Sequence, residues 1–146
     1  MNRVEDIERY LRAKLAVEHQ PDPGPTAPPA RPFVTISRSA GTGGRDLADA
    51  IVEHFDARRD IELFHGWRVY DRQVCEIVAE DPRFASSLDQ LLEEEYRSKT
   101  NDFFHQIVRS TVDQHLVMNR VFLVVRTIAG MGRAVIVGRA GAQVTR

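Results

Sequence analysis

The fold is decided by residues 33–45, which read FVTISRSAGTGGR. Residues 33–37 form an apolar, β-branched run of the kind that makes a strand, and a glycine-rich turn follows them. The next segment, from about residue 45 to residue 55, predicts an amphipathic helix. Its apolar stripe consists of Leu47, Ala48, Ile51, Val52 and Phe55. A strand, a glycine turn and a helix in this order are typical of a phosphate-binding loop.

Three glycines make the turn suitable for an anion: Gly41, Gly43 and Gly44. They let the backbone approach closely, and the unsatisfied N–H groups at the helix start point at the anion with the helix dipole behind them. In the loop form G-x-x-x-x-G-K-[ST] a lysine follows the last glycine, whereas here Gly44 takes that place. Arg38 and Arg45 are the available substitutes and therefore the candidate catalytic side chains. The missing lysine favours phosphate binding over catalysis.

Three further polar side chains belong to the predicted loop. Ser39 and Thr42 can offer a hydroxyl to a phosphate oxygen or to Mg²⁺. Asp46 lies in the first helical turn, where a carboxylate interacts favourably with the helix dipole. The same carboxylate would repel a phosphate unless Mg²⁺ or an arginine lay between them, so Asp46 is either on the metal side or evidence against nucleotide binding.

Two other interpretations of residues 38–46 remain open. The loop can be a tight connection between strand and helix that holds no ligand. A dinucleotide fingerprint fits worse, because its last position is Asp46, and a bulky anion would then stand at the close contact of strand and helix.

Composition divides the chain into three parts. Residues 1–20 contain an amphipathic helix over 3–18, whose apolar side chains recur at spacings of three and four: Val4, Ile7, Leu11 and Leu15. Residues 21–32 hold six of the seven prolines and predict an extended linker. Residues 33–146 are the predicted core. The N-terminal helix would dock on this core, pair with its copy in a dimer, or only promote solubility.

Past the first helix, the pattern predicts a short strand and two helices. The strand covers residues 67–70, and Asp71 caps a helix over residues 72–80. Asp81-Pro82 ends that helix. The next helix is expected to start with a capping-box pattern made of Ser86, Ser87, Asp89 and Gln90.

The last part of the chain predicts more helix and a buried strand. Residues 102–129 keep helical spacing as one long helix or two, and residues 134–137 form the apolar run of a strand that is covered on both faces. The order is thus strand, helix, strand, helices, strand. Such alternation predicts an α/β fold with a parallel sheet flanked by helices and right-handed crossovers.

Charge and apolar content exclude some classes of function. A net charge of -1 provides no global field for nucleic acid or an anionic membrane. The longest apolar run, residues 121–125, is far below the about 20 residues of a membrane-spanning helix. The single cysteine, Cys75, excludes an internal disulfide and, without a basic and apolar leader, predicts a cytoplasmic protein. Cys75 itself fits a small apolar helix residue.

Three segments together resemble the cytidylate kinase-like family, a branch of the P-loop nucleoside monophosphate kinases. They read VTISRSAGTGGRDLADAI, VYDRQVCEIVAED and AVIVGRAGAQV. The first is the most specific, because the family shows the same I-S-R followed by G-x-G-G-R and an acidic residue. The resemblance spans residues 33–146.

This resemblance implies a doubly wound sheet and a pair of nucleotide substrates. ATP, with Mg²⁺, would be held by residues 38–45, and the acceptor would be a nucleoside monophosphate such as CMP. Asp71 and Arg72 would face the acceptor, and Gly138-Arg139 would match the Gly-Arg pair that ends the third strand. An aspartate follows that pair in cytidylate kinases, whereas here Ala140 leaves the acceptor open. Asp71 is equally explained as a helix cap, and the alternative for Arg139 is an exposed arginine at a strand end.

The resemblance departs from the family at the C-terminus. Related kinases continue with a central strand, an arginine-bearing lid helix and a final strand, whereas this sequence ends at Arg146. A lid supplies charge to the transition state and excludes water. We therefore expect an incomplete core, either because the chain is a fragment or because a second copy or a partner protein covers the sheet edge.

Two functional hypotheses follow. The first is a kinase fold that, in full-length form, transfers phosphate from ATP to a nucleoside monophosphate. The second is a catalytically inactive module for nucleotide binding or assembly, which contacts a partner through residues 1–20.

Overall fold

The computed structural model describes most of the chain in two compact units. The described residues are 2–18, 31–39, 41–58, 60–98, 114–138 and 141–145. One unit, here called the sheet unit, comprises Ala27–Val74 and Val125–Arg146. The other, here called the helical unit, comprises Met1–Thr26 and Cys75–Val124. Of the predicted linker 21–32, all but the last two residues lie outside the described part.

The sheet unit is built on three parallel strands. They are β1 (Val34–Ile36), β2 (Arg68–Asp71) and β3 (Ala134–Val137), in the spatial order β1-β3-β2. Val137 of the central strand is in register with Ile36 on one side and with Asp71 on the other. The carboxyl ends of all three strands therefore meet at one edge of the sheet. The predicted parallel sheet and its three strands are confirmed.

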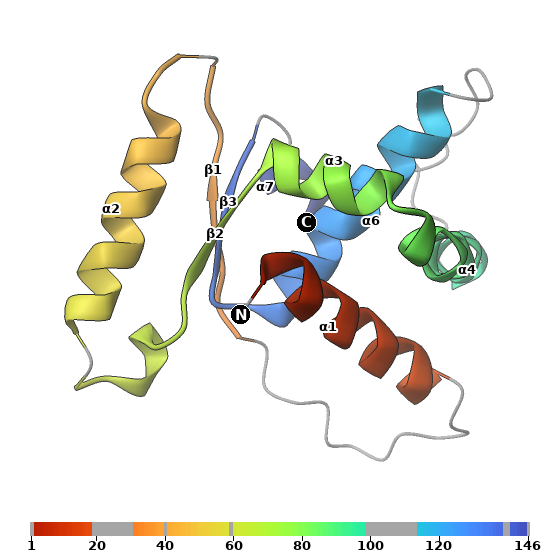
Figure 1. The fold of residues 1–146 in the computed structure, drawn as a ribbon, viewed down its shortest axis with the longest axis horizontal. Coiled ribbons are helices and arrows are strands. Elements are labelled where there is room, and N and C mark those ends of the chain that lie inside the picture. The colour runs from red at the N-terminus through yellow and green to blue at the C-terminus, as the bar shows by residue number, and fades with distance from the viewer. Residues whose placement is uncertain are drawn as a thin grey trace. The chain divides into compact units, whose positions relative to one another are not determined.

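Helix α2 (Gly44–Ala57) covers one face of this sheet. It begins at the glycine turn after β1 and runs back along the strands (Figure 1). A buried cluster joins the helix to the sheet: Ala48, Trp67, Val69, Val135 and Val137, with Val34, Ile36, Ile51, Val52 and Phe55 packed against it. All four residues of β3 are buried, as expected for a central strand of a parallel sheet.

Aromatic packing anchors the end of α2 that is remote from the glycine turn. The ring of Phe55 lies 4.8 Å from the rings of both Phe64 and Trp67, measured between centroids. Trp67 Nε1 donates a hydrogen bond of 2.7 Å to the carbonyl of Leu63 in the 3₁₀ helix η1 (Glu62–Phe64). Since the helix is held at this end, its other end is fixed relative to the strands.

The opposite face of the sheet is approached by the short helix α7 (Gly141–Val144), which contacts β1. A Cβ atom placed on Gly141 would lie 3.4 Å from the side chain of Thr35 and 3.9 Å from that of Ile136. Thr35 lies between Val34 and Ile36, which face α2, and successive strand residues point to opposite faces. The sheet is therefore flanked by helices on both sides.

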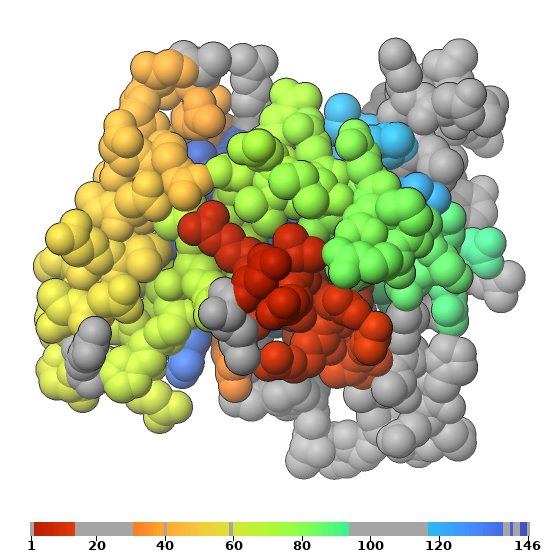
Figure 2. Space-filling model, in the orientation of Figure 1, coloured from red at the N-terminus to blue at the C-terminus, as the bar shows by residue number. Residues whose placement is uncertain are grey.

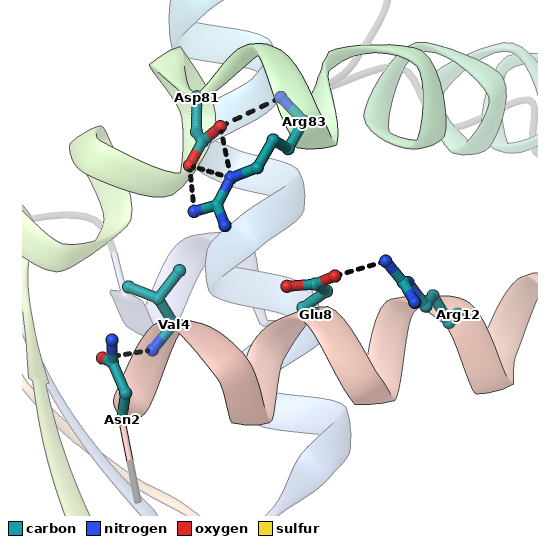
Figure 3. Close-up of polar contacts among 6 residues, drawn as sticks. All are labelled: Asn2, Val4, Glu8, Arg12, Asp81 and Arg83. Atoms are coloured by element: carbon teal, nitrogen blue, oxygen red, sulfur yellow. Dashed lines mark hydrogen bonds and ion pairs between the residues drawn. The ribbon is translucent and has the colours of Figure 1, made fainter.

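Among the described residues, four helices contribute to the helical unit. They are α1 (Arg3–Glu18), α3 (Arg72–Glu80), α4 (Pro82–Ser98) and α6 (Gln114–Met131), of which α3 begins and α6 ends in the sheet unit. Helix α1 packs against α4, and its Ile7 and Leu11 are fully buried. The side chain of Asn2 accepts a hydrogen bond of 3.2 Å from the N–H of Val4 and so caps α1 (Figure 3).

Helix α4 begins earlier than the sequence predicted. It starts at Pro82, and Ser86 and Ser87 lie inside it. Proline suits the first helical position because its missing N–H would be unpaired there anyway. Asp81 accepts a hydrogen bond of 2.9 Å from the N–H of Arg83 and also pairs with the Arg83 guanidinium (Figure 3). The prediction was wrong because the cap is Asp81 and not the serine pair.

Helix α6 confirms the C-terminal half of the long predicted helix, while residues 99–113 lie outside the described part. It ends at Met131, two residues later than predicted, and Gly132 follows with φ at +69°, a left-handed conformation that commonly ends helices. Among the described helices, none combines the length and the apolar character needed to cross a membrane.

Candidate functional site

The predicted site residues follow the carboxyl ends of the three strands. Arg38 lies two residues after the end of β1, Arg72 follows β2, and Gly138 follows β3. The N–H of Gly138 donates a hydrogen bond of 3.0 Å to the carbonyl of Ile36, so the chain leaves β3 beside the start of the glycine turn. In open α/β sheets, ligands bind at this edge. Arg139, the other residue predicted for the acceptor, lies outside the described part of the chain.

The glycine turn has a backbone that requires glycine at two positions. Gly41 and Gly43 both have φ at +74°, a conformation that residues with a Cβ rarely adopt. The hydroxyl of Thr42 donates a hydrogen bond of 2.8 Å to the carbonyl of Ser39 and tightens the turn. All four residues are exposed, and the segment from β1 to α2, orange to yellow, forms part of the surface in Figure 2.

Helix α2 begins without a side-chain cap. Gly43 is its N-cap residue, and no side-chain hydrogen bond closes this end. The carbonyl of Gly43 already accepts the N–H of Leu47 at 3.0 Å, so the helix is formed from its first turn. The first N–H groups of a helix have no partner within the helix. This end of α2 therefore presents backbone donors at the carboxyl edge of the sheet.

Arg38 runs across Gly44, the residue at the lysine position. A Cβ atom on Gly44 would lie 2.4 Å from Cδ of Arg38 and 3.1 Å from its Cβ and Cγ. The Nε atom of Arg38 is buried and has no hydrogen-bond partner in the described structure. Its Nη1 reaches the carbonyl of Ser39 only at 3.5 Å. Among the described residues, Arg38 is thus a cation beside the glycine turn with few hydrogen-bond partners.

Arg45 is engaged by two carboxylates. Its Nε donates to Asp49 at 3.0 Å, and its Nη1 donates to Oδ2 of Asp71. The other oxygen of Asp71 accepts the N–H of Val74 at 3.1 Å, which confirms Asp71 as the cap of α3. One aspartate therefore caps a helix and also ties the start of α2 to the end of β2.

Asp46 and Arg72 are exposed at the starts of α2 and α3. The described residues include no group of three or more His, Cys, Asp and Glu side chains that could bind a metal ion. Mg²⁺ in nucleotide sites is commonly held by one or two carboxylates and the substrate phosphates. Asp46, in the first turn of α2 and two residues after Gly44, is the acidic side chain next to this loop.

Sequence reasoning found the members of the site but missed three contacts. The pair Arg45 and Asp49 has the spacing of four that brings side chains together on a helix, so the pattern could have revealed it. The contact of Arg45 with Asp71 spans 26 positions and depends on the pairing of strands. The path of Arg38 over Gly44 depends on a side-chain rotamer, which sequence patterns do not specify.

A comparison with known protein families matches residues 33–146 to the cytidylate kinase-like family. The chain belongs to the cytidylate kinase-like family. The match covers all three strands and the glycine turn and leaves out α1, and the resemblance of the three sequence segments is confirmed. Searches among curated proteins and among solved structures gave no match.

Membership of the cytidylate kinase-like family indicates a function related to nucleotide kinases. The parallel sheet flanked by helices is consistent with a P-loop kinase-like fold. The loop differs at Gly44 from the G-x-x-x-x-G-K-[ST] form, and Arg38 crosses the position where the side chain of that lysine would begin.

Proposed function

We propose that this chain binds the phosphates of a nucleoside triphosphate, with ATP as the donor, in the loop of residues 38–45. The same site would transfer the terminal phosphate to a nucleoside monophosphate of the CMP type. The observation that carries the proposal is an uncapped helix start after a glycine turn, at the carboxyl edge of the sheet of a cytidylate kinase-like chain.

Backbone donors supply the phosphate affinity in this proposal. Each charge-assisted hydrogen bond contributes about 1.5 to 3 kcal/mol, so three or four of them can hold a phosphate without a lysine. Gly41 and Gly43 leave the approach open, because they carry no side chain and sit at φ of +74°. The exposed Ser39 adds a hydroxyl at the same turn.

The side chains at the loop fit a magnesium ion that comes with the nucleotide. The Thr42 hydroxyl donates a hydrogen bond to the carbonyl of Ser39, and the lone pairs of its oxygen remain available to a ligand. Asp46 is exposed and adds a carboxylate at the first turn of α2. When bound, Mg²⁺ would supply positive charge to the transferring phosphoryl group. These oxygens and the nucleotide phosphates would make up its ligands.

The acceptor would bind beside the ends of β2 and β3. Arg72 is exposed at the start of α3 and can contact the acceptor phosphate. Asp71 already uses both carboxylate oxygens, on Arg45 and on Val74, so we assign it the role of holding the site together. Gly138 leaves room for the acceptor where β3 ends, and the family resemblance adds Arg139.

A second candidate function is nucleotide binding without transfer. Gly44 favours it, because the lysine it replaces follows the phosphoryl group through the reaction. In this case the chain would act as a nucleotide-responsive or assembly module. A partner would contact the exposed side of α1, since Ile7 and Leu11 are buried in the helical unit.

Titration of the protein with ATP and Mg²⁺, then with CMP, separates the two functions when calorimetry is combined with a coupled assay for ADP. A heat of ATP binding together with CMP-dependent formation of ADP supports phosphate transfer. A heat of ATP binding without formation of ADP supports the second function. Gly43→Val should abolish binding. Gly66→Val is the matched control, because Gly66 also has φ at +74° but lies away from the loop. Equal binding by wild type and Gly43→Val, or no binding by folded wild type, would refute the loop assignment.

A further inference from the structure

Gly44 is a glycine for a different reason from its neighbours. Gly41 and Gly43 have positive φ values, whereas Gly44 is the first residue of α2 and its φ lies outside the left-handed region. Backbone conformation therefore does not require glycine there. The present position of Arg38 requires a glycine at this place. Real Cβ atoms essentially never approach another heavy atom within 3.0 Å, and a Cβ on residue 44 would lie 2.4 Å from Cδ of Arg38.

The aliphatic part of Arg38 fills the volume in which a side chain at position 44 would begin. Its Cβ, Cγ and Cδ are the three nearest atoms to that point. In the lysine-containing loop, the lysine side chain leaves the backbone at this position. The two arrangements exclude each other sterically: either residue 44 carries a side chain, or Arg38 follows its present path.

We propose that Arg38 takes the role that lysine has in the G-x-x-x-x-G-K-[ST] loop. Residue 38 supplies the cation of the phosphate loop, and residue 44 is a glycine to leave room for it; we call this replacement the exchange. This inference rests on the proposed function and names the side chain that contacts the donor phosphates. A phosphate oxygen would accept hydrogen bonds from the outer Nη atoms of Arg38, of which Nη1 reaches the carbonyl of Ser39 only at 3.5 Å. The Nε atom is buried and has no partner among the described residues, so a small shift of the side chain toward the anion would also relieve an unpaired donor.

Arg45 does not have the same freedom. Its guanidinium donates to Asp49 and Asp71, so two negative charges surround one positive charge. A phosphate would have to compete with both carboxylates for this side chain. Arg45 therefore stabilises the loop through its contacts with Asp49 and Asp71, and Arg38 is the cation available to the ligand.

Calorimetry tests this division of roles between Arg38 and Arg45. The probes are inorganic triphosphate alone and ATP with Mg²⁺. Arg38→Gly should weaken binding of both by about 10- to 100-fold, the loss of one charge-assisted hydrogen bond. Arg45→Ala should weaken binding by less than about fivefold and lower the melting temperature. Arg58→Ala, at the far end of α2, removes the same charge as a control and should leave the affinity unchanged.

The exchange itself is tested by combining substitutions. Arg38→Gly with Gly44→Lys should restore most of the affinity lost in Arg38→Gly, because the lysine then has the vacated path. Stability gives a readout that needs no ligand. Gly44→Ala should lower the melting temperature of the wild type and leave it unchanged or raise it in the Arg38→Gly background.

The outcomes distinguish this inference from the proposed function. If folded wild-type protein binds neither probe, the proposed function fails, and the thermal measurements alone decide the steric exchange. If wild type binds and Arg38→Gly binds equally well, the loop assignment stands and the role of Arg38 is overturned. Equal effects of Gly44→Ala in both backgrounds would overturn the steric exchange.

Discussion

Two helix starts in this chain are built in opposite ways. Helix α4 begins at Pro82, which has no N–H, and Asp81 accepts the N–H of Arg83. Helix α2 begins after Gly43, which has no side chain to accept anything. A side-chain cap stabilises a helix by about 0.5 to 2 kcal/mol relative to alanine at that position, but by only a few tenths of a kcal/mol relative to glycine. Gly43 therefore leaves its N–H groups uncapped at a small cost in stability, and in our proposal this start is open to a ligand.

Two other helix starts extend the contrast. Helix α1 is capped by Asn2, and α3 is capped by Asp71. In both helices a side-chain oxygen accepts an N–H group of the first turn, as Asp81 does at the start of α4. Helix α2 lacks this feature at the one start that lies after a glycine turn and at the carboxyl edge of the sheet.

The largest effect is expected from closing the open start. Gly43→Asp places a negative charge where the phosphates would bind and offers its oxygen to the same N–H groups. We expect the affinity for inorganic triphosphate to fall by about 100-fold, as measured by calorimetry. Gly43→Asn is the control: it tolerates positive φ as aspartate does but adds no charge, so it should lose less. Equal losses would argue against an anion at this position.

A smaller effect is expected from opening the capped start of α3. Asp71→Ala removes the cap and the partner of Arg45, and should lower the free energy of unfolding by about 1 to 2 kcal/mol in a denaturant titration. Asp71→Asn keeps an oxygen for the N–H of Val74 and loses only the ion pair. It should therefore lose less than the alanine variant, and the reverse order would contradict the assigned capping role.

Removing the cap of α4 should lower the stability of the protein without changing its affinity for triphosphate. Asp81→Ala removes the acceptor for Arg83 and should reduce the melting temperature by less than Asp71→Ala. The partner of Asp81 is the largely exposed Arg83 two residues away, whereas Asp71 also holds Arg45 of another helix. Asp60→Ala, an exposed aspartate outside any helix cap, is the matched control. A loss of triphosphate affinity in Asp81→Ala would break the proposed division between structural and functional helix starts.

The smallest effect concerns the pH dependence at the same junction. The hydrogen bond from the Arg83 side chain lowers the pKa of Asp81 below its ordinary value of 3.8. The ionised carboxylate therefore contributes stability above the unfolded-state pKa, and this contribution is lost as the pH falls through the folded-state pKa. The stability gap between wild type and Asp81→Asn should be constant near neutral pH and shrink below about pH 4. A gap that widens in acid would contradict the assigned direction.

Short-range patterns were sufficient to predict much of this fold. The strand at β1, the helix after the glycine turn, the cap at Asp71 and the buried β3 follow from the identities of neighbouring residues. The start of α4 was missed because two capping signals compete over a few residues, and the aspartate before Pro82 forms the cap.

The arrangement of the site was less predictable. The sequence identified the loop and its two arginines but gave them equal roles. Asp71 meets Arg45 because β2 and α2 are brought together through the sheet, and Arg38 crosses Gly44 because of its rotamer. Both contacts are set by packing between residues distant along the chain or by side-chain geometry, which local patterns do not encode.

The central claim is that the backbone N–H groups at the start of α2 hold a phosphate. It is tested most directly by recording amide resonances while the protein is titrated with inorganic triphosphate. We predict saturable shifts for the amides of Gly43 and Gly44, with the capped amides of Val74 and Arg83 unchanged. Saturating triphosphate that leaves the glycine amides unshifted, or that shifts the capped amides equally, would contradict the claim.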